Sequence, residues 1–238
     1  MFKNLTFLAL ALLMTSCPQD IGQILDSGLG TTAQSLTNTE IVAGLKEALS
    51  KGAGNSSDLL SRADGFYKSP YKILLPAEAR KVTDRLQGIP GFAQLEENIL
   101  EKINRGAEDA AKSAKPIFLR AIRAMSVRDA LGILKGEKDA ATSYLKRTTF
   151  DQLYTEFNPV IIESLDKFNA RTTWTNAVNA YNKIPFNSDK ADPNLDDYIT
   201  RKALDGLFQQ VAKEELDIRT NLRSRTTDLL RKVFAEQD

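Results

Sequence analysis

The sequence predicts a mainly α protein, a single multi-helix domain of orthogonal or bundled helices with at most one short two-stranded element. Apolar residues recur at intervals of three and four along most of the chain, which is the period of an amphipathic helix. Two capping-box patterns mark helix starts, and alternation with a period of two is almost absent. Short breaks at glycine and proline separate the periodic segments, as in a helical bundle.

The first helix is expected to begin after Thr37. This residue is followed three positions later by Glu40, and the pair forms a capping box, in which two helix-end N–H groups are satisfied reciprocally. We expect Gly52 and Gly54 to end the helix, because glycine is a poor residue for a helix interior. Its apolar face consists of Ile41, Leu45, Ala48 and Leu49.

Further helices follow in order along the chain. Pro116 is compatible with the first turn of one of them, and Ser126 with Asp129 forms a second capping box. The remaining apolar stripes fall within residues 92–111, 117–125, 127–134, 150–157, 161–168, 174–181, 199–211 and 229–234.

Two short segments are candidates for extended structure. Residues 69–76, "SPYKILLP", contain the one stretch that alternates, and residues 183–186, "KIPF", form a second extended candidate. We expect these two segments to pair if the domain contains any sheet.

The start of the chain has the pattern of a secretory signal. Lys3 is followed by an apolar run from Leu5 to Met14, which is shorter than the roughly 20 residues that a membrane-spanning helix needs. The run ends in "MTSC", residues 14–17, which resembles a bacterial lipobox with Met14 in place of the usual leucine. We therefore predict cleavage before Cys17 and lipid attachment to its thiol, because two or more acyl chains anchor a protein stably. The alternative is that Cys17 is a buried core residue within a retained helix.

These features divide the chain into three parts. Residues 1–16 are the predicted signal peptide, residues 17–35 a lipid-anchored tether, and residues 36–238 a single helical domain. The predicted location is the cell envelope of a Gram-negative-type bacterium, with the domain facing the periplasm. Pro18 replaces the aspartate that commonly retains lipoproteins in the inner membrane, which favours the outer membrane.

Composition excludes several classes of function. The chain contains no histidine, which rules out Ser-His-Asp and Cys-His catalytic arrangements and histidine-bound zinc or haem. Cleavage would remove Lys3 and no acidic residue, and the mature chain would then have as many basic as acidic residues. This neutral balance argues against a nucleic-acid partner. With the single cysteine acylated, no disulfide can form, so the fold must depend on its core.

An acidic stretch contains the first group of candidate site residues. Asp192, Asn194 and Asp196 have the alternate spacing of the first ligands of a calcium loop, but the glycine and glutamate that such a loop needs further on are missing. We expect Asp192 or Asn194 to cap the next helix, with Asp196 and Asp197 near the positive end of its dipole. A cation site and a partner-binding site, with Asp189 included, stay open as alternatives.

A basic group near the carboxyl terminus is the counterpart of the acidic stretch. Its guanidinium groups have a shape that suits carboxylates and phosphates. They are expected on a solvated helix face, or paired with the acidic stretch, or holding an anionic envelope ligand. The group consists of Arg219, Arg223, Arg225, Arg231 and Lys232.

Four stretches of the chain resemble, in the same order, a bacterial family known only as domain of unknown function 4197. The resemblance extends from about Leu36 to Phe234, and it implies an exported protein, often a lipoprotein, with no assigned activity or catalytic residue. It also marks Tyr181, Lys183 and Phe186 as candidate binding residues, although aromatic residues beside a turn more often belong to a core. One departure is the absence of a proline near Leu222. The stretches are "DALGILKGEKDAATSYLKRTT" (129–149), "YNKIPF" (181–186), "PNLDDYITRKALDGLFQQVAKEELDIR" (193–219) and "RTTDLLRKVF" (225–234).

The leading functional hypothesis is a lipid-anchored interaction or structural module of the envelope, with the membrane and an envelope protein as partners. A binding protein that holds a hydrophobic or anionic ligand between its helices is the second hypothesis. A histidine-independent hydrolase is the third, and adjacent pairs such as Glu214 and Glu215 do not support it, because neighbours on a helix point about 100° apart. We expect no catalytic residue, cofactor or metal.

Overall fold

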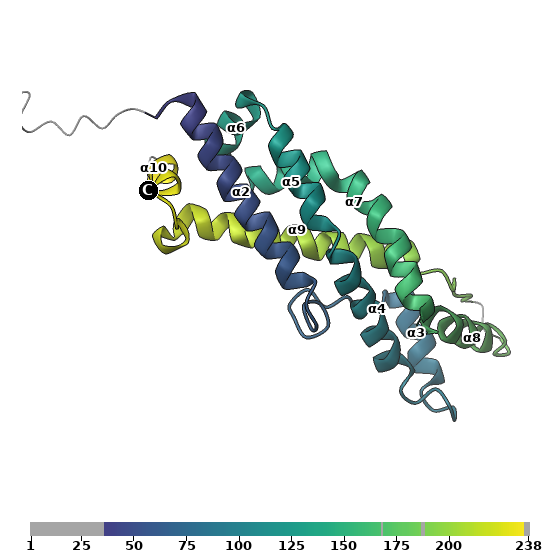
Figure 1. Ribbon diagram of the computed structural model, residues 1–238. Helices are drawn as coiled ribbons and strands as arrows, with labels where there is room; N and C mark the ends of the chain where they lie inside the picture. The colour runs from purple at the N-terminus through teal and green to yellow at the C-terminus, as the bar shows by residue number, and fades with distance from the viewer. Residues whose placement is uncertain (1–35, 168, 187–188, 236–238) are drawn as a thin grey trace, which may run out of the picture. The chain divides into compact units, whose positions relative to one another are not determined.

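The computed structural model describes residues 36–167, 169–186 and 189–235, and within them nine α-helices and one short 3-10 helix (Figure 1). The predicted signal peptide, Cys17 and the tether lie outside the described residues. The helices are α2 (Asn38–Leu60), α3 (Ala77–Leu86), α4 (Leu95–Ala111), α5 (Ala114–Ala124), α6 (Val127–Leu134), α7 (Ala140–Lys167), α8 (Ala170–Asn182), α9 (Asp196–Thr220), the 3-10 helix η1 (Leu222–Ser224) and α10 (Asp228–Ala235).

The predicted mainly α single domain is confirmed. Both capping boxes form as expected: the Thr37 hydroxyl accepts the N–H of Glu40 at 3.2 Å, and the Ser126 hydroxyl accepts that of Asp129 at 3.2 Å. In each box the carboxylate accepts a hydrogen bond from the backbone N–H of the capping residue in return. These helix starts therefore follow from local sequence alone.

The predicted end of the first helix at Gly52 and Gly54 is wrong, because α2 continues to Leu60. Both glycines are buried against other helices. A Cβ placed on Gly52 would lie 3.3 Å from Cβ of Glu214 in α9, and one on Gly54 would lie 3.6 Å from Lys115 in α5. The small residues let these helices approach α2 closely, so packing outweighs the low helix propensity of glycine.

The predicted pairing of two extended segments is also wrong, since no strand forms in the described residues. Residues 72–76 belong to no helix or strand, and a side chain bonds their backbone where a partner strand would. Asn104 Oδ1 accepts the N–H of Ile73 at 2.7 Å, and Asn104 Nδ2 donates to the carbonyl of Ile73 at 3.0 Å. Residues 183–186 form a turn after α8 instead of an extended piece.

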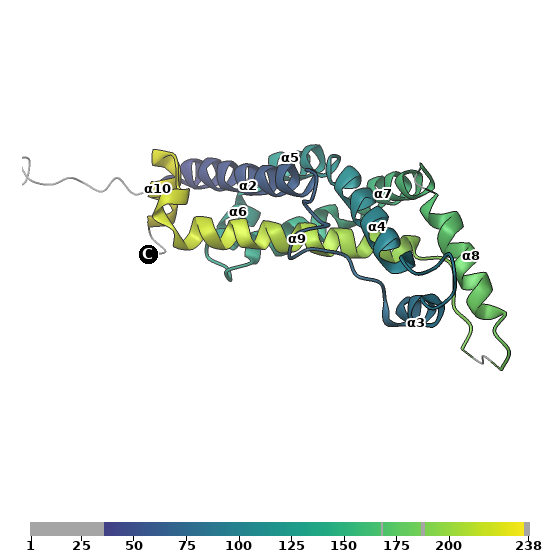
Figure 2. The ribbon, with the colours of Figure 1, turned by 90° about the horizontal axis from the view of Figure 1, so that it is seen from below.

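Helix α9 is the central element of the arrangement. It packs against α2, α4 and α7, and α7 also packs against α4 and α5. Figures 1 and 2 show α9 running from the region of α8 at its start to α10 at its end. Phe118 of α5 and Phe208 of α9 meet edge to face in the core, with 5.8 Å between ring centroids. The two ends of α9 thus lie in separate parts of the domain, which separates the acidic and basic candidate residues.

No helix among the described residues combines the length and apolar character needed to cross a membrane.

Candidate functional site

Asp196 and Asp197 open α9, and they contact different neighbours. Asp197 points to α7, where it accepts a hydrogen bond from the Tyr154 hydroxyl at 2.7 Å. It also accepts two bonds from Arg201 Nε at 3.0 Å. Hydrogen bonds from Arg201, and next from Tyr154, lower the pKa of Asp197, and the same carboxylate raises the pKa of Tyr154. This group lies on the surface and is internally satisfied.

Asp196 points to α8 and takes part in a different cluster. Its Oδ2 lies 3.3 Å from Nη2 of Arg171, whose Nη1 donates to both carboxylate oxygens of Asp166, at 3.2 and 3.0 Å. The Asp196 side chain is 13% exposed, whereas that of Asp166 is 52% exposed. Burial raises the pKa of Asp196, Arg171 opposes this shift, and the charge of Asp166 adds to it. One guanidinium therefore joins two carboxylates from two helices.

An open cleft of about 380 Å³ adjoins this cluster. Its walls come from the end of α7, the exposed face of α8 and the segment that leads into α9. Seven of its eight lining residues have polar or charged side chains: Asp166, Arg171, Thr172, Thr175, Asn176, Asn194 and Asp196, with Pro193 as the eighth. The volume is in the range of small-molecule sites, so this cleft is the main candidate for ligand binding.

The segment before α9 is organised by short-range side-chain bonds. Asp192 Oδ1 accepts the N–H of Asn194 at 2.8 Å, and Asn194 Oδ1 accepts the N–H of Asp196 at 3.0 Å. Asn194 thus satisfies the first helical N–H, although Leu195 occupies the N-cap position itself. Asp189 lies apart and forms an ion pair with Lys81 at 3.1 Å. Across the described ranges, no three His, Cys, Asp or Glu residues lie close enough together to hold a metal ion.

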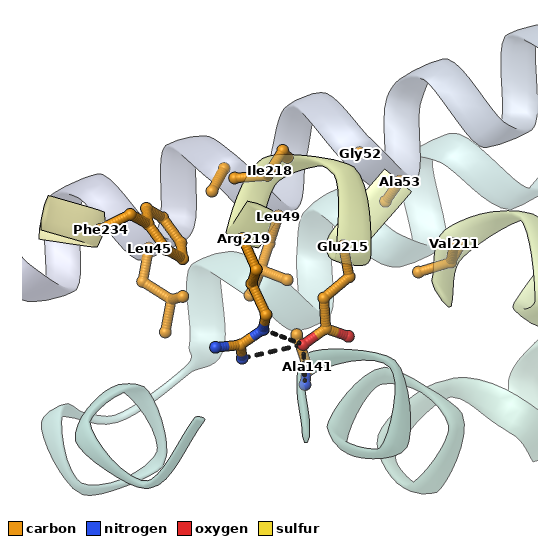
Figure 3. A pocket seen from close by; sticks show the side chains of 11 residues that line it. Leu45, Leu49, Gly52, Ala53, Ala141, Val211, Glu215, Ile218, Arg219 and Phe234 are labelled. Carbon is orange, nitrogen blue, oxygen red and sulfur yellow. Dashed lines mark hydrogen bonds and ion pairs between the residues drawn. The ribbon is translucent and has the colours of Figure 1, made fainter. Parts of the chain in front are cut away.

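At the other end of α9, Arg219 belongs to a buried network with Glu215 (Figure 3). Glu215 Oε1 accepts hydrogen bonds from Arg219 Nε at 3.0 Å and Nη2 at 2.9 Å, and from the N–H of Ala141 at 3.0 Å. Glu215 Oε2 accepts the N–H and the hydroxyl of Thr142, both at 2.8 Å. Arg219 Nη2 also donates to the carbonyl of Ile133, at the end of α6, at 2.9 Å. A carboxylate of α9 thereby satisfies N–H groups at the start of α7.

Arg225 is buried too, and it closes the end of α9. Its Nε donates to the carbonyl of Ile218 at 3.0 Å, and its Nη2 donates to that of Arg219 at 2.8 Å. The expected solvated face is therefore wrong for Arg219 and Arg225. Pairing of Arg219 with Asp196 is excluded by geometry, since 23 residues of helix separate them by roughly 35 Å. Arg231 instead forms a surface pair with Asp228 at 2.5 Å.

The space beside the buried network is small. The cavity between α2, α9 and α10 has a volume of about 20 Å³, which is room for a single water molecule. Leu45, Leu49, Ile218 and Phe234 surround it (Figure 3). This end of the domain is therefore tightly packed and offers no space for a ligand.

The segment "YNKIPF" has two different environments. Tyr181 is buried in the core at the end of α8, as expected for an aromatic residue beside a turn, and Lys183 is the exposed C-cap of that helix. Phe186 is fully exposed and has a positive φ of 60°, which is uncommon for a residue with a Cβ. The structure does not bring these three residues into one site.

Sequence reasoning missed the partners that define both clusters. Arg171 and Asp166 lie about one turn apart across the boundary between α7 and α8. The apolar stripes at 161–168 and 174–181 separate these two helices, but neither Asp166 nor Arg171 was singled out as a site residue. A usable signal was present in α8, where Thr172, Thr175 and Asn176 form a polar stripe at helical spacing. Glu215 lies four residues before Arg219, which is the spacing of a helical ion pair.

Comparison with known proteins gives one family. The family model described as "Protein of unknown function (DUF4197)" matches residues 35–235. No match was found among curated proteins or among solved structures.

Proposed function

The chain belongs to the DUF4197 family of proteins of unknown function, and on that premise we propose that it is a lipid-anchored interaction or structural module of the bacterial cell envelope. The anchor would be acylated Cys17, and residues 17–35 would tether the helical domain on the periplasmic side of the membrane, with the outer membrane favoured. The support for the anchor is the signal-like run followed by "MTSC" at residues 14–17.

The tight packing of the helical domain favours an interaction or structural module over a carrier of lipids or other apolar molecules. In the part of the chain that the structure describes, two interhelical cavities beside α9 have volumes of about 20 Å³ each. Pockets that enclose a small molecule have volumes of roughly 300–1,000 Å³. A domain packed in this way contacts other molecules through its surface, where the cleft beside Arg171 and the exposed Phe186 are the prominent features.

The carboxylates of the cleft do not support the hydrolase hypothesis. Glycoside hydrolysis needs one carboxyl group that donates a proton and a second that acts as a base or nucleophile. Asp166 and Asp196 both face the cleft, but the Arg171 guanidinium lies between them and pairs with both, so neither carboxylate is left free to act on a substrate. We therefore propose binding and not catalysis.

Metabolic labelling with a fatty-acid analogue tests the anchor. We expect the wild-type chain to incorporate the label and to fractionate with membranes, and Cys17→Ser to lose both properties. Pro18→Ala is a matched control, because it changes the neighbouring residue and keeps the thiol. A wild-type chain whose single cysteine reacts with maleimide after denaturation, without bound lipid, would contradict the proposal.

A further inference from the structure

Trp174 of α8 has a buried hydrogen-bond donor without a partner. The residue is 3% exposed, and its indole Nε1 makes no hydrogen bond within the part of the chain that the structure describes. Buried polar groups are almost always paired with protein, water or a ligand. The unpaired indole N–H therefore indicates that a group from outside the chain, a water or a ligand, accepts its hydrogen bond.

A small inner cavity lies beside this indole. Its volume is about 20 Å³, which fits one water-sized group. Trp174, Arg171 and Asp196 contribute its polar lining. The other lining residues are apolar: Ile99, Ile103, Leu165, Ala170, Pro193, Leu195 and Ile199. The wall of the cavity is thus apolar on most sides, and its polar groups lie on α8 and at the start of α9.

Asp196 supplies the complementary group. Its carboxylate is largely buried, and the interaction seen for it within the described residues is the 3.3 Å contact with Arg171. A carboxylate can accept about four hydrogen bonds, so acceptor capacity is left over. The residues that line the inner cavity thus include one with an unpaired indole donor, Trp174, and one with a carboxylate acceptor, Asp196.

A hydroxyl group matches this pair, because it accepts one hydrogen bond and donates another. An ammonium group only donates, and it would leave the indole N–H unpaired. A carboxylate or phosphate of a ligand only accepts when ionised; it could pair with Arg171, but it would be repelled by Asp196 and could donate no hydrogen bond to it. The chemistry thus selects a hydroxyl-bearing ligand over a cationic or anionic one.

The outer cleft has room for the rest of such a ligand. It shares Arg171, Pro193 and Asp196 with the inner cavity and has a volume of about 380 Å³. Thr172, Thr175, Asn176 and Asn194 add hydroxyl and amide groups that both donate and accept. We propose that the cleft between α8 and the start of α9 binds a saccharide, one hydroxyl of which enters the inner cavity between the Trp174 N–H and the Asp196 carboxylate. This inference does not depend on the lipid anchor.

The chain contains a single tryptophan, so its intrinsic fluorescence reports on this site directly. The test is a fluorescence titration of the chain, produced without the signal peptide, with maltose, trehalose and N,N′-diacetylchitobiose, each to high millimolar concentration. The first two probes represent free neutral sugars, and the third represents the glycan of a cell wall. We expect a saturable change in emission with at least one of the three, and the probe that binds best identifies the source.

Variants assign the binding to the named groups, with calorimetry as the readout because it does not need the indole. Asp196→Asn replaces the charged acceptor by a neutral amide, and Trp174→Phe removes the indole donor, while both keep most of the side-chain volume. We expect each to weaken saccharide binding by about tenfold or more, the scale of one lost hydrogen bond to a charged or buried group. Asp197→Asn is the matched control, because its carboxylate bonds Tyr154 and Arg201 outside the cleft, and it should bind like wild type.

If a buried variant fails to fold, Thr175→Val provides a second test. Thr175 lies in the outer cleft, and valine has nearly the same shape without the hydroxyl. Circular dichroism identifies the variants that fold. Flat titrations with all three saccharides would overturn the proposal and leave the inner cavity to a structural water. A stronger response to spermidine or Ca²⁺ than to any saccharide would overturn it in favour of a cation site.

Discussion

The carboxylate of Glu215 and the guanidinium of Arg219 meet one turn apart inside α9, with 2.9 Å between Oε1 and Nη2 and with side chains only 6% and 7% exposed. The same helix contains a second pair with the same spacing, Asp197 and Arg201, whose side chains are 61% and 56% exposed. One helix therefore offers a buried and an exposed example of the same interaction.

Removing Arg219 is expected to destabilise the domain strongly. Arg219→Ala would leave the Glu215 charge buried with only the N–H groups of Ala141 and Thr142 and the Thr142 hydroxyl as partners, and loss of one member of a buried pair typically costs about 3–5 kcal/mol. Urea unfolding followed by circular dichroism measures the change. Arg201→Ala is the control, for which the expected loss is about 0.5 kcal/mol or less. Equal losses for the two variants would show that Glu215 is not confined as the structure indicates.

The close contact of α2 with α10 gives a second prediction. A Cβ on Gly44 would lie 2.6 Å from Cγ2 of Val233 and 3.2 Å from Cγ of Leu229. Gly44→Ala should therefore displace α10, with a cost of about 1–3 kcal/mol from overpacking.

Thermal unfolding and limited proteolysis near α10 measure this effect. Gly132→Ala in α6 is the matched control, since nothing lies within 4 Å of the new methyl group. It should stabilise the domain by up to about 1 kcal/mol through helix propensity alone. If Gly44→Ala stabilised the domain by the same amount, α10 would not be packed against α2.

The helix starts at Thr37 and Ser126 could be predicted because a capping box is a local interaction between residues three positions apart. The end of α2 could not be predicted in that way. Gly52 lies in the middle of the helix because Glu214 and Ile218, more than 150 residues later, need the space that a side chain would fill. Local propensity alone contains no information about such a distant neighbour.

In the candidate site, too, local interactions could be predicted from the sequence and contacts between distant residues could not. The acidic residues before and within the start of α9 were identified from their pattern, and the use of Asn194 at the start of that helix follows from local chemistry. That Asp196 meets Arg171, whereas Asp197 meets Tyr154, depends on which helices lie beside α9. Trp174 was assigned to an apolar stripe, and only the burial of its unpaired Nε1 marks it as part of a site.

Asn104 gives a third prediction, because its amide replaces a partner strand. Asn104→Ala would remove the side chain that bonds both the N–H and the carbonyl of Ile73, at 2.7 and 3.0 Å. Buried groups left unpaired cost about 1–3 kcal/mol each, so we expect a loss of at least about 2 kcal/mol. Hydrogen exchange at the Ile73 amide should accelerate as well. Asn98→Ala, on the exposed face of the same helix, should change stability by no more than about 0.5 kcal/mol, and a similar loss in both variants would contradict the role of Asn104.

The two adjacent carboxylates at the start of α9 should titrate apart. Burial raises the pKa of Asp196, whereas hydrogen bonds from Arg201 and Tyr154 lower that of Asp197. A raised carboxyl pKa means that the contribution of Asp196 to stability is complete below its unfolded pKa and is lost as the pH rises through its folded value. For Asp197 the order is reversed: its contribution is complete above the unfolded pKa and is lost as the pH falls through the folded value.

Carboxyl ¹³C chemical shifts of the two residues measure this separation directly, with the higher midpoint expected for Asp196. Trp174 lines the same inner cavity as Asp196, so its fluorescence should follow the ionisation of Asp196 in the acid range. Asp196→Asn should abolish this transition, and Asp197→Asn should leave it in place, because the Asp197 carboxylate faces α7. A lower midpoint for Asp196 than for Asp197 would mean that the Arg171 ion pair outweighs burial at this carboxylate.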